Sequence, residues 1–124
     1  MNISTSPLAL SSTDMSNSTI TSNAIWLGNI INYNIQIVFT GSPVGTFTLE
    51  VSDDDGNTKQ PIIDPATESI TNWSTYQGSS QSISAAGNHS YEVQNSGHRW
   101  ARIKYTKTSG TGTITSCRVN IKGA

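Results

Sequence analysis

The feature that most constrains the fold is an alternation of apolar and polar side chains with a period of two. It is clearest over residues 31–39, where every second side chain is apolar, and it recurs over residues 46–52 and 100–106. A period of two places alternate side chains on opposite faces of a β-strand. No window shows a sustained period of 3.6, so we expect an all-β chain with essentially no helix.

Turn signals separate the long alternating segments. In the first turn, Pro43 fixes its own φ between two glycines that allow positive φ, which predicts a hairpin formed by residues 31–39 and 46–52. The second turn has the sequence Ser-Gly-Thr-Gly. It predicts another hairpin, formed by residues 100–106 and 114–121.

Two further strands carry apolar residues with a definite phase. In the first strand of the domain we expect Ile20, Ala24 and Trp26 to share one face. In the last strand the apolar phase shifts between Ile114 and Cys117, which predicts a β-bulge between them. Cys117 is the only cysteine, and its place in the alternation predicts a small core residue.

Short strands with frequent turns predict a two-sheet antiparallel β-sandwich of jelly-roll type with about eight strands. The 124 residues fit one domain, which we expect over residues 18–124. Residues 1–17 are rich in Ser and Thr and show no sustained period. They predict an N-terminal arm that is flexible or ordered by a partner, and a frayed terminus is the alternative.

The charge composition excludes two classes of partner. Only 12% of the residues are charged, and the formal net charge is −1. A nucleic-acid-binding surface needs a strong basic excess, and a membrane span needs about 20 apolar residues in a row. Because the chain has neither, we expect no contact with nucleic acid or with a membrane. We expect faces covered by hydroxyl and amide groups.

No pattern in the chain predicts catalysis. A Gly-x-Ser-x-Gly nucleophile elbow and a His-x-x-x-His zinc spacing are both absent from the sequence. The two histidines, His89 and His98, are expected at strand ends on the surface. We therefore predict that the protein is not an enzyme.

A cluster of acidic and amide residues offers a candidate metal site. Asp53, Asp55, Asn57 and Asp64 have a spacing similar to that of a calcium loop. Gly56 falls at the fourth position of this loop instead of the sixth, and no helices are expected around it. The alternative is a polar turn in which the carboxylates accept hydrogen bonds from the backbone. Apart from this candidate structural Ca²⁺, no cofactor is expected.

Aromatic side chains form the candidate binding site. Trp100 and Arg102 alternate with the core-facing residues of their strand, and Trp73 and Tyr76 precede a glycine turn. Exposed aromatic rings stack on sugars or anchor contacts between subunits. These four residues are therefore a candidate platform. The alternative is that a neighbouring sheet or subunit covers this face as well.

Four blocks of the sequence, residues 34–52, 73–76, 100–113 and 121–123, together resemble small virion proteins of tailed bacteriophages. The strand Arg-Ile-Lys-Tyr, residues 102–105, is also similar to the closing strands of discoidin-like jelly rolls, many of which bind carbohydrates. The resemblance to virion proteins implies a capsid-decoration, head-fibre or tail-associated protein located in the virion. It implies a homo-oligomer, with a trimer favoured, that docks to other virion proteins.

The alternative function is a carbohydrate-binding β-sandwich module that uses the exposed aromatic residues. The two functions are compatible, because a virion protein present in many copies gains from weak, multivalent binding to a host surface glycan. Low charge also suits close, repetitive packing, since symmetry multiplies each contact between like charges.

Overall fold

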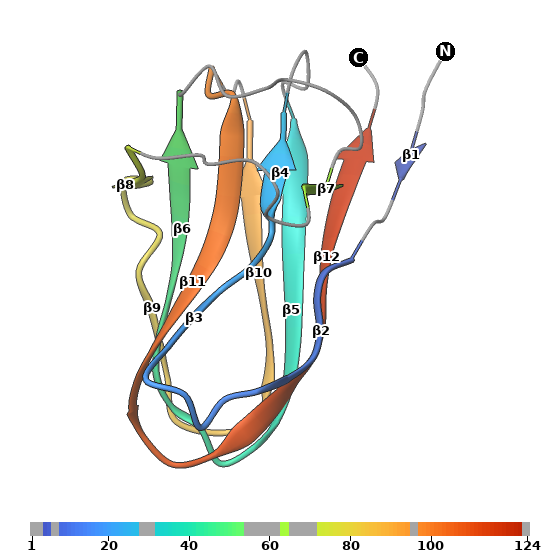
Figure 1. Cartoon of the computed structure of the whole chain (residues 1–124). Coiled ribbons are helices and arrows are strands. Elements are labelled where there is room, and N and C mark those ends of the chain that lie inside the picture. The colour runs from blue at the N-terminus through green and yellow to red at the C-terminus, as the bar shows by residue number, and fades with distance from the viewer. Residues whose placement is uncertain are drawn as a thin grey trace.

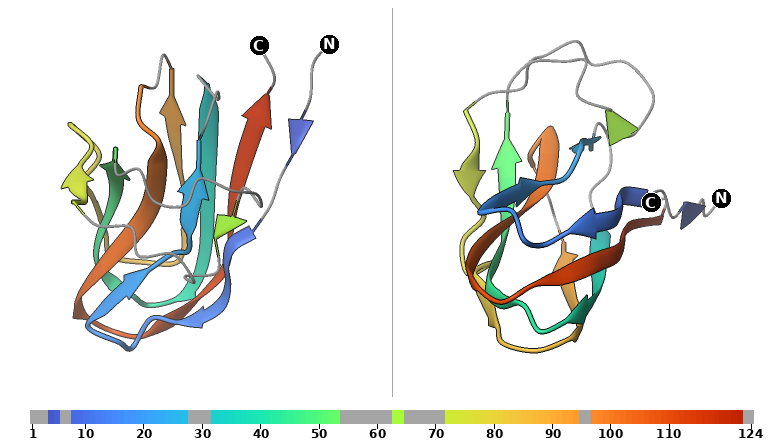
Figure 2. Two further views of the ribbon diagram at one scale, coloured as in Figure 1. Left: turned by 45° about the horizontal axis from the view of Figure 1, so that its top comes forward. Right: turned by 60° about the horizontal axis from the view of Figure 1, so that its bottom comes forward.

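The computed structural model describes residues 4–5, 8–27, 32–53, 63–64, 72–94 and 97–122. These residues form twelve β-strands and no helix, so the predicted all-β sandwich is confirmed. Two antiparallel sheets face each other across a hydrophobic core (Figures 1 and 2). The strands are β1 (Ser4–Thr5), β2 (Leu8–Asp14), β3 (Thr19–Thr21), β4 (Ala24–Trp26), β5 (Tyr33–Gly41), β6 (Val44–Ser52), β7 (Ile63–Asp64), β8 (Ser74–Thr75), β9 (Gln81–Ile83), β10 (Gly87–Val93), β11 (Trp100–Ser109) and β12 (Gly112–Lys122).

The strand order is that of a jelly roll. Sheet A runs β1/β2–β12–β5–β10, and sheet B runs β7–β3/β4–β11–β6–β8/β9. Two strands joined by a slash form hydrogen bonds with different parts of the same neighbouring strand. We therefore count them together as one strand position. Leaving out the short edge strand β7, the described strands occupy eight positions, ordered 1-8-3-6 in sheet A and 2-7-4-5 in sheet B. Strands from opposite ends of the chain therefore pair, as they do in a jelly roll.

The two predicted hairpins are wrong, although their strands are present. β5 and β6 lie in different sheets, and so do β11 and β12. Each turn is an arch that carries the chain from one sheet to the other. β5 pairs instead with β12, and β6 pairs with β11. A strand with one buried face has the same alternation in a hairpin and in an arch between facing sheets, so the pattern does not distinguish them.

The two arches lie against each other at one end of the sandwich, at the bottom of Figure 1. The backbone N–H of Ser42 in the first arch donates a hydrogen bond of 2.8 Å to the carbonyl of Thr111 in the second. Gly41 and Gly110 have φ angles of +91° and +75°. A Cβ atom on Gly110 would collide with the carbonyl oxygen of Ser42. Glycine is therefore required at this position by the contact between the arches as well as by the backbone conformation.

The core fills the space between the sheets. Cys117 is fully buried in it, as predicted, and burial raises the pKa of its thiol to about 12. The predicted bulge is also confirmed, because the register of β12 against β5 shifts between Ile114 and Ser116. The core residues are Met15, Ile20, Ile25, Leu27, Tyr33, Ile35, Ile37, Phe39, Phe47, Leu49, Val51, Tyr91, Val93, Ala101, Ile103, Tyr105, Ile114, Cys117 and Val119.

Part of the expected N-terminal arm lies in sheet A of the same chain. β1 and β2 both pair with β12, and Met15, which follows β2, is fully buried. The strand positions thus begin within residues 1–17, before residue 18 where we placed the start of the sandwich.

The phase predicted for the first strand is wrong beyond Ile20. Ile20 and Ile25 are buried in the core, whereas Ala24 and Trp26 lie half-buried on the opposite face. The reason is an interruption at Ser22, between β3 and β4. The N–H of Ser22 donates to the carbonyl of Ile103 at 2.8 Å, and its hydroxyl accepts from the N–H of Ile103 at 2.9 Å. This contact between β11 and the segment joining β3 to β4 shifts the alternation by one residue.

Candidate functional site

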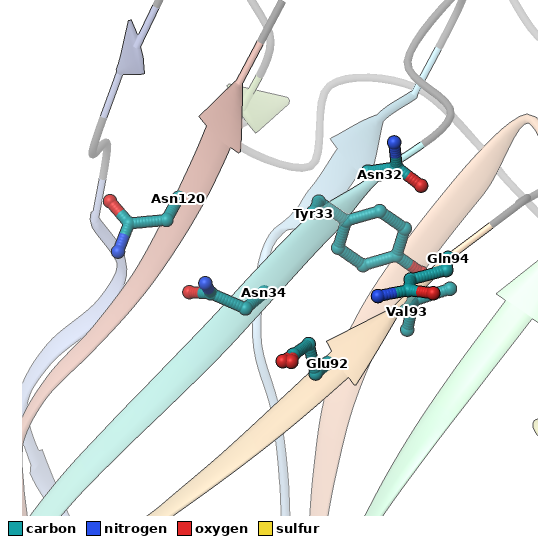
Figure 3. A pocket seen from close by; sticks show the side chains of 7 residues that line it. All are labelled: Asn32, Tyr33, Asn34, Glu92, Val93, Gln94 and Asn120. Carbon is teal, nitrogen blue, oxygen red and sulfur yellow. The ribbon is translucent and has the colours of Figure 1, made fainter.

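The outer face of sheet A has a shallow hollow lined by polar side chains. Figure 3 shows Asn34, Glu92 and Asn120 lying on three neighbouring strands around it. In the register of the sheet, Asn34 on β5 lies opposite Glu92 on β10 and opposite Asn120 on β12. The hollow has a volume of about 230 Å³, and Asn32, Gln94 and the core residues Tyr33 and Val93 also line it. It adjoins a second depression of about 340 Å³ further along the same strands.

A second row of polar side chains continues this face toward the arches. Gln36 lies opposite Ser90 on β10 and opposite Arg118 on β12, and all three side chains are exposed. Neighbouring strands are about 4.8 Å apart, so each row spans roughly 10 Å. The two rows combine amide, hydroxyl, carboxylate and guanidinium groups, which supply both donors and acceptors. We call these six residues the polar face. Its chemistry suits a ligand with many hydroxyl groups.

The sequence indicated only one strand of the polar face. The alternation over residues 31–39 assigned Asn34 and Gln36 to the polar side of their strand, and the structure places them there. Glu92 and Asn120 were not predicted as site residues. Their position depends on β10 and β12 pairing with β5, and no local pattern carries that information.

Trp100 is buried, so it offers no surface to a ligand. It lies on the outer face of sheet B, because its neighbour Ala101 points into the core. Its exposed fraction is nevertheless 0%. The ring of Trp26, which lies opposite it in the sheet, packs against it with centroids 5.0 Å apart. Trp100 is thus covered by a residue of its own sheet, whereas Lys104 and Thr106 on the same face of β11 are half-buried and exposed. The structure shows no neighbouring sheet or subunit over this face in the described part of the chain.

Trp73 and Arg102 contact each other on the same outer face of sheet B. The Arg102 guanidinium lies 4.3 Å from the centroid of the Trp73 ring, a cation–π geometry. The Nε–H of Arg102 also donates a hydrogen bond of 2.8 Å to the carboxylate of Glu50, which is buried. One face of the Trp73 ring is thus occupied by a side chain of the protein. The arrangement fastens the segment before β8 to the sheet.

Tyr76 lies apart from the other three candidates. It packs against the hydrophobic core, on the inner side of sheet B, and its ring meets His98 edge-on at 6.4 Å. His98 in turn has its Nδ1 atom 3.3 Å from both carboxylate oxygens of Asp53. Sheet B therefore separates Tyr76 from Trp73 and Arg102. The four sequence candidates do not form one platform.

The candidate calcium site falls mostly outside the described residues. Asp53 is described, and besides His98 it accepts a hydrogen bond of 3.2 Å from the N–H of Arg99. Asp55 and Asn57 lie outside the described part of the chain. Asp64 belongs to β7, but its side chain is not described. Among the residues that are described, no group of three or more His, Cys, Asp or Glu side chains is placed to hold a metal ion.

Within the described ranges, no helix is long and apolar enough to cross a membrane. A scan against protein-family models found no match to this chain, and a search of the curated proteins found none either.

Proposed function

We propose that this chain is a non-catalytic structural module of a tailed-bacteriophage virion, which forms a closed homo-oligomer and docks to other virion proteins. The observation that carries the proposal is the location of the two longest blocks of the sequence resemblance. Residues 34–52 run through β5, the first arch and β6, and residues 100–113 run through β11 and the second arch into β12. These blocks supply the central strand pair of sheet B, β6 with β11, and in sheet A they supply β5 and the first two residues of its partner β12. The resemblance thus concerns the frame of a jelly roll, a fold that viral capsid proteins use.

The surface chemistry of the two sheets supports the same proposal. The outer face of sheet A presents amides and hydroxyls such as Gln36 and Ser90, and sheet B presents Thr46 and Thr48 on its outer face. In a symmetric assembly each side chain recurs in every copy, so a repulsive charge pair is multiplied by the number of contacts. Faces with few charges reduce this penalty, and the two charged residues of the polar face, Glu92 and Arg118, have opposite signs.

Light scattering coupled to size-exclusion chromatography tests the self-assembly of the purified chain. We expect one closed oligomer over a wide range of protein concentration. A monomer at every concentration would contradict self-assembly. The virion role has its own test, which is mass spectrometry of gradient-purified phage particles from cells that carry the gene. Peptides of the chain should sediment with infectious particles, and their absence from these particles would contradict the role.

The polar face favours a second candidate function, binding of a neutral oligosaccharide. Its amide and hydroxyl groups are suitable partners for sugar hydroxyls. It lies on sheet A, whereas three residues of the platform predicted from the sequence, Trp73, Trp100 and Arg102, lie on the outer face of sheet B. A glycan array followed by NMR titration tests this function. Asn34→Ala and Gln36→Ala should weaken the binding found for the wild type, whereas Thr48→Ala on sheet B should not. Failure of the wild type to bind any neutral glycan on the array would refute this candidate.

A further inference from the structure

In the described part of the chain, three of the four sheet edges are short or irregular. In sheet B, the edge strands β7, β8 and β9 have only two or three residues each. In sheet A, the edge formed by β1 and β2 is interrupted, its register shifts opposite Cys117, and Ser12 has a φ of +47°. Short strands and irregularities of this kind prevent an edge from pairing with another chain.

The fourth edge, β10, has none of these protections. It runs for seven residues, Gly87–Val93, and its register against β5 is uninterrupted from one end to the other. It contains no proline, lysine or bulge, and Glu92 is its only acidic residue. Among the described strands only β5 pairs with it. A long, regular edge of this kind is a template for a further strand.

The direction of the free backbone groups of β10 follows from the contacts of β5 with β12. The carbonyl of Val38 accepts a hydrogen bond of 3.1 Å from the hydroxyl of Thr115 on β12, so it points toward the β12 side of β5. Backbone groups alternate in direction along a strand, so those of Gln36 also point to β12. Ser90 lies opposite Gln36. Its N–H and carbonyl therefore point away from β5, out of the free edge, as do those two residues before and after it.

We propose that β10 pairs antiparallel with β10 of a second copy of this chain across a two-fold axis at Ser90. This contact joins the two A sheets into one continuous sheet. Ser90 of each copy would exchange two N–H···O hydrogen bonds with Ser90 of the other. Glu92 would lie opposite Asn88 of the second copy, so no like charges face each other. In total, three N–H groups from each copy gain an acceptor.

This inference rests on the self-assembly in the proposed function and names the contact that makes it. A two-fold contact predicts an even number of copies, whereas the resemblance to virion proteins favours a trimer. The proposed self-assembly and the proposed pairing of β10 can therefore be refuted separately. A wild-type monomer would overturn both, and a wild-type trimer would overturn only the pairing of β10.

Ser90→Pro is the decisive variant. Proline removes the outward N–H and places its ring at the free edge, but it removes no hydrogen bond to β5. Ser90→Ala is the matched control, because it keeps the N–H and loses only the hydroxyl. By light scattering we expect wild type and Ser90→Ala to have the same even copy number and Ser90→Pro to have half of it. Circular dichroism checks that all three are folded. A folded Ser90→Pro with the wild-type mass would overturn the inference.

A charge substitution tests the register without disturbing the backbone. In the proposed pair, Asn88→Lys places a cation opposite Glu92 of the second copy, and Asn88→Glu places an acid there. Each cross-strand charge pair contributes about 0.2–1 kcal/mol, and the two-fold axis makes two of them. The dissociation constant should therefore fall about 2- to 30-fold for Asn88→Lys and rise by a similar factor for Asn88→Glu. Equal effects of the two variants would overturn the register.

Discussion

The contact between the two arches makes a quantitative prediction for Gly110. Gly110 and Gly78 have nearly the same positive φ, +75° and +76°. Their surroundings differ. A Cβ atom on Gly78 would have no atom within 4 Å, whereas a Cβ atom on Gly110 would collide with the carbonyl oxygen of Ser42 in the opposite arch. Comparing Gly110→Ala with Gly78→Ala therefore separates the cost of the collision from the cost of the conformation.

The expected magnitudes follow from these two costs. A left-handed conformation costs an L-residue about 1–2 kcal/mol, and both variants incur this cost. The loss of backbone freedom in the unfolded chain is also common to both, so it cancels in the difference. Forcing an extra carbon into a close-packed contact costs a further 1–3 kcal/mol or so. We therefore expect Gly78→Ala to lose about 1–2 kcal/mol of unfolding free energy and Gly110→Ala about 2–5 kcal/mol.

Urea denaturation followed by circular dichroism measures both values, and similar m-values would show that the two transitions are comparable. If Gly110→Ala is no less stable than Gly78→Ala, the arches do not pack as tightly as described. The explanation given for the glycine would then be wrong.

Three other predictions concern buried or half-buried polar groups. Burial raises the pKa of the Cys117 thiol to about 12. We therefore expect iodoacetamide at pH 8 to label Cys117 only in denaturant, measured by mass spectrometry, and rapid labelling of the native protein would contradict this. Burial lowers the pKa of His89 below its usual 6.5, so the unfolded chain binds this proton more tightly than the folded one. The unfolding free energy of the wild type should thus fall as the pH drops below about 6.5, and that of His89→Gln should fall less; equal pH dependence would refute the effect. Arg102→Ala removes the 2.8 Å hydrogen bond to the buried carboxylate of Glu50, at a cost of about 1.5–3 kcal/mol in urea denaturation. Adding Glu50→Gln should recover part of that loss, and simple additivity would contradict the pairing.

Local patterns predicted the strands and the core well. The alternation over residues 31–39 corresponds to β5, and the phase shift before Cys117 is a real bulge in β12. These features depend on the period of the strand and on which side chains are apolar, and both can be read within one segment. Cys117 was correctly placed in the core for the same reason.

The pairing of the strands could not be predicted in this way. The turns at Pro43 and Gly110 have the residues of hairpin turns, yet both are arches. What distinguishes an arch here is the contact between the two turns, through Ser42 and Thr111, which are almost seventy residues apart in the sequence. The polar face has the same origin, since it is assembled from β5, β10 and β12. The alternation within each strand shows which of its side chains are polar. Which strands lie side by side is determined by the jelly-roll order of the sheet.

The expected aromatic platform failed because of one contact between residues far apart in the sequence, Ser22 and Ile103, which the alternation pattern does not reveal. The period of two, continued from Ile20, places Trp26 on the core face and leaves Trp100 exposed. The hydrogen bonds between Ser22 and Ile103 interrupt the strand and move Trp26 to the outer face, where it packs on Trp100. Because of this shift, the Trp100 ring is covered by Trp26 and is not available to stack on a ligand. With Arg102 lying over Trp73, the aromatic residues stabilise the outer face of sheet B. The surfaces left for recognition are the polar face of sheet A and the free edge of β10 beside it.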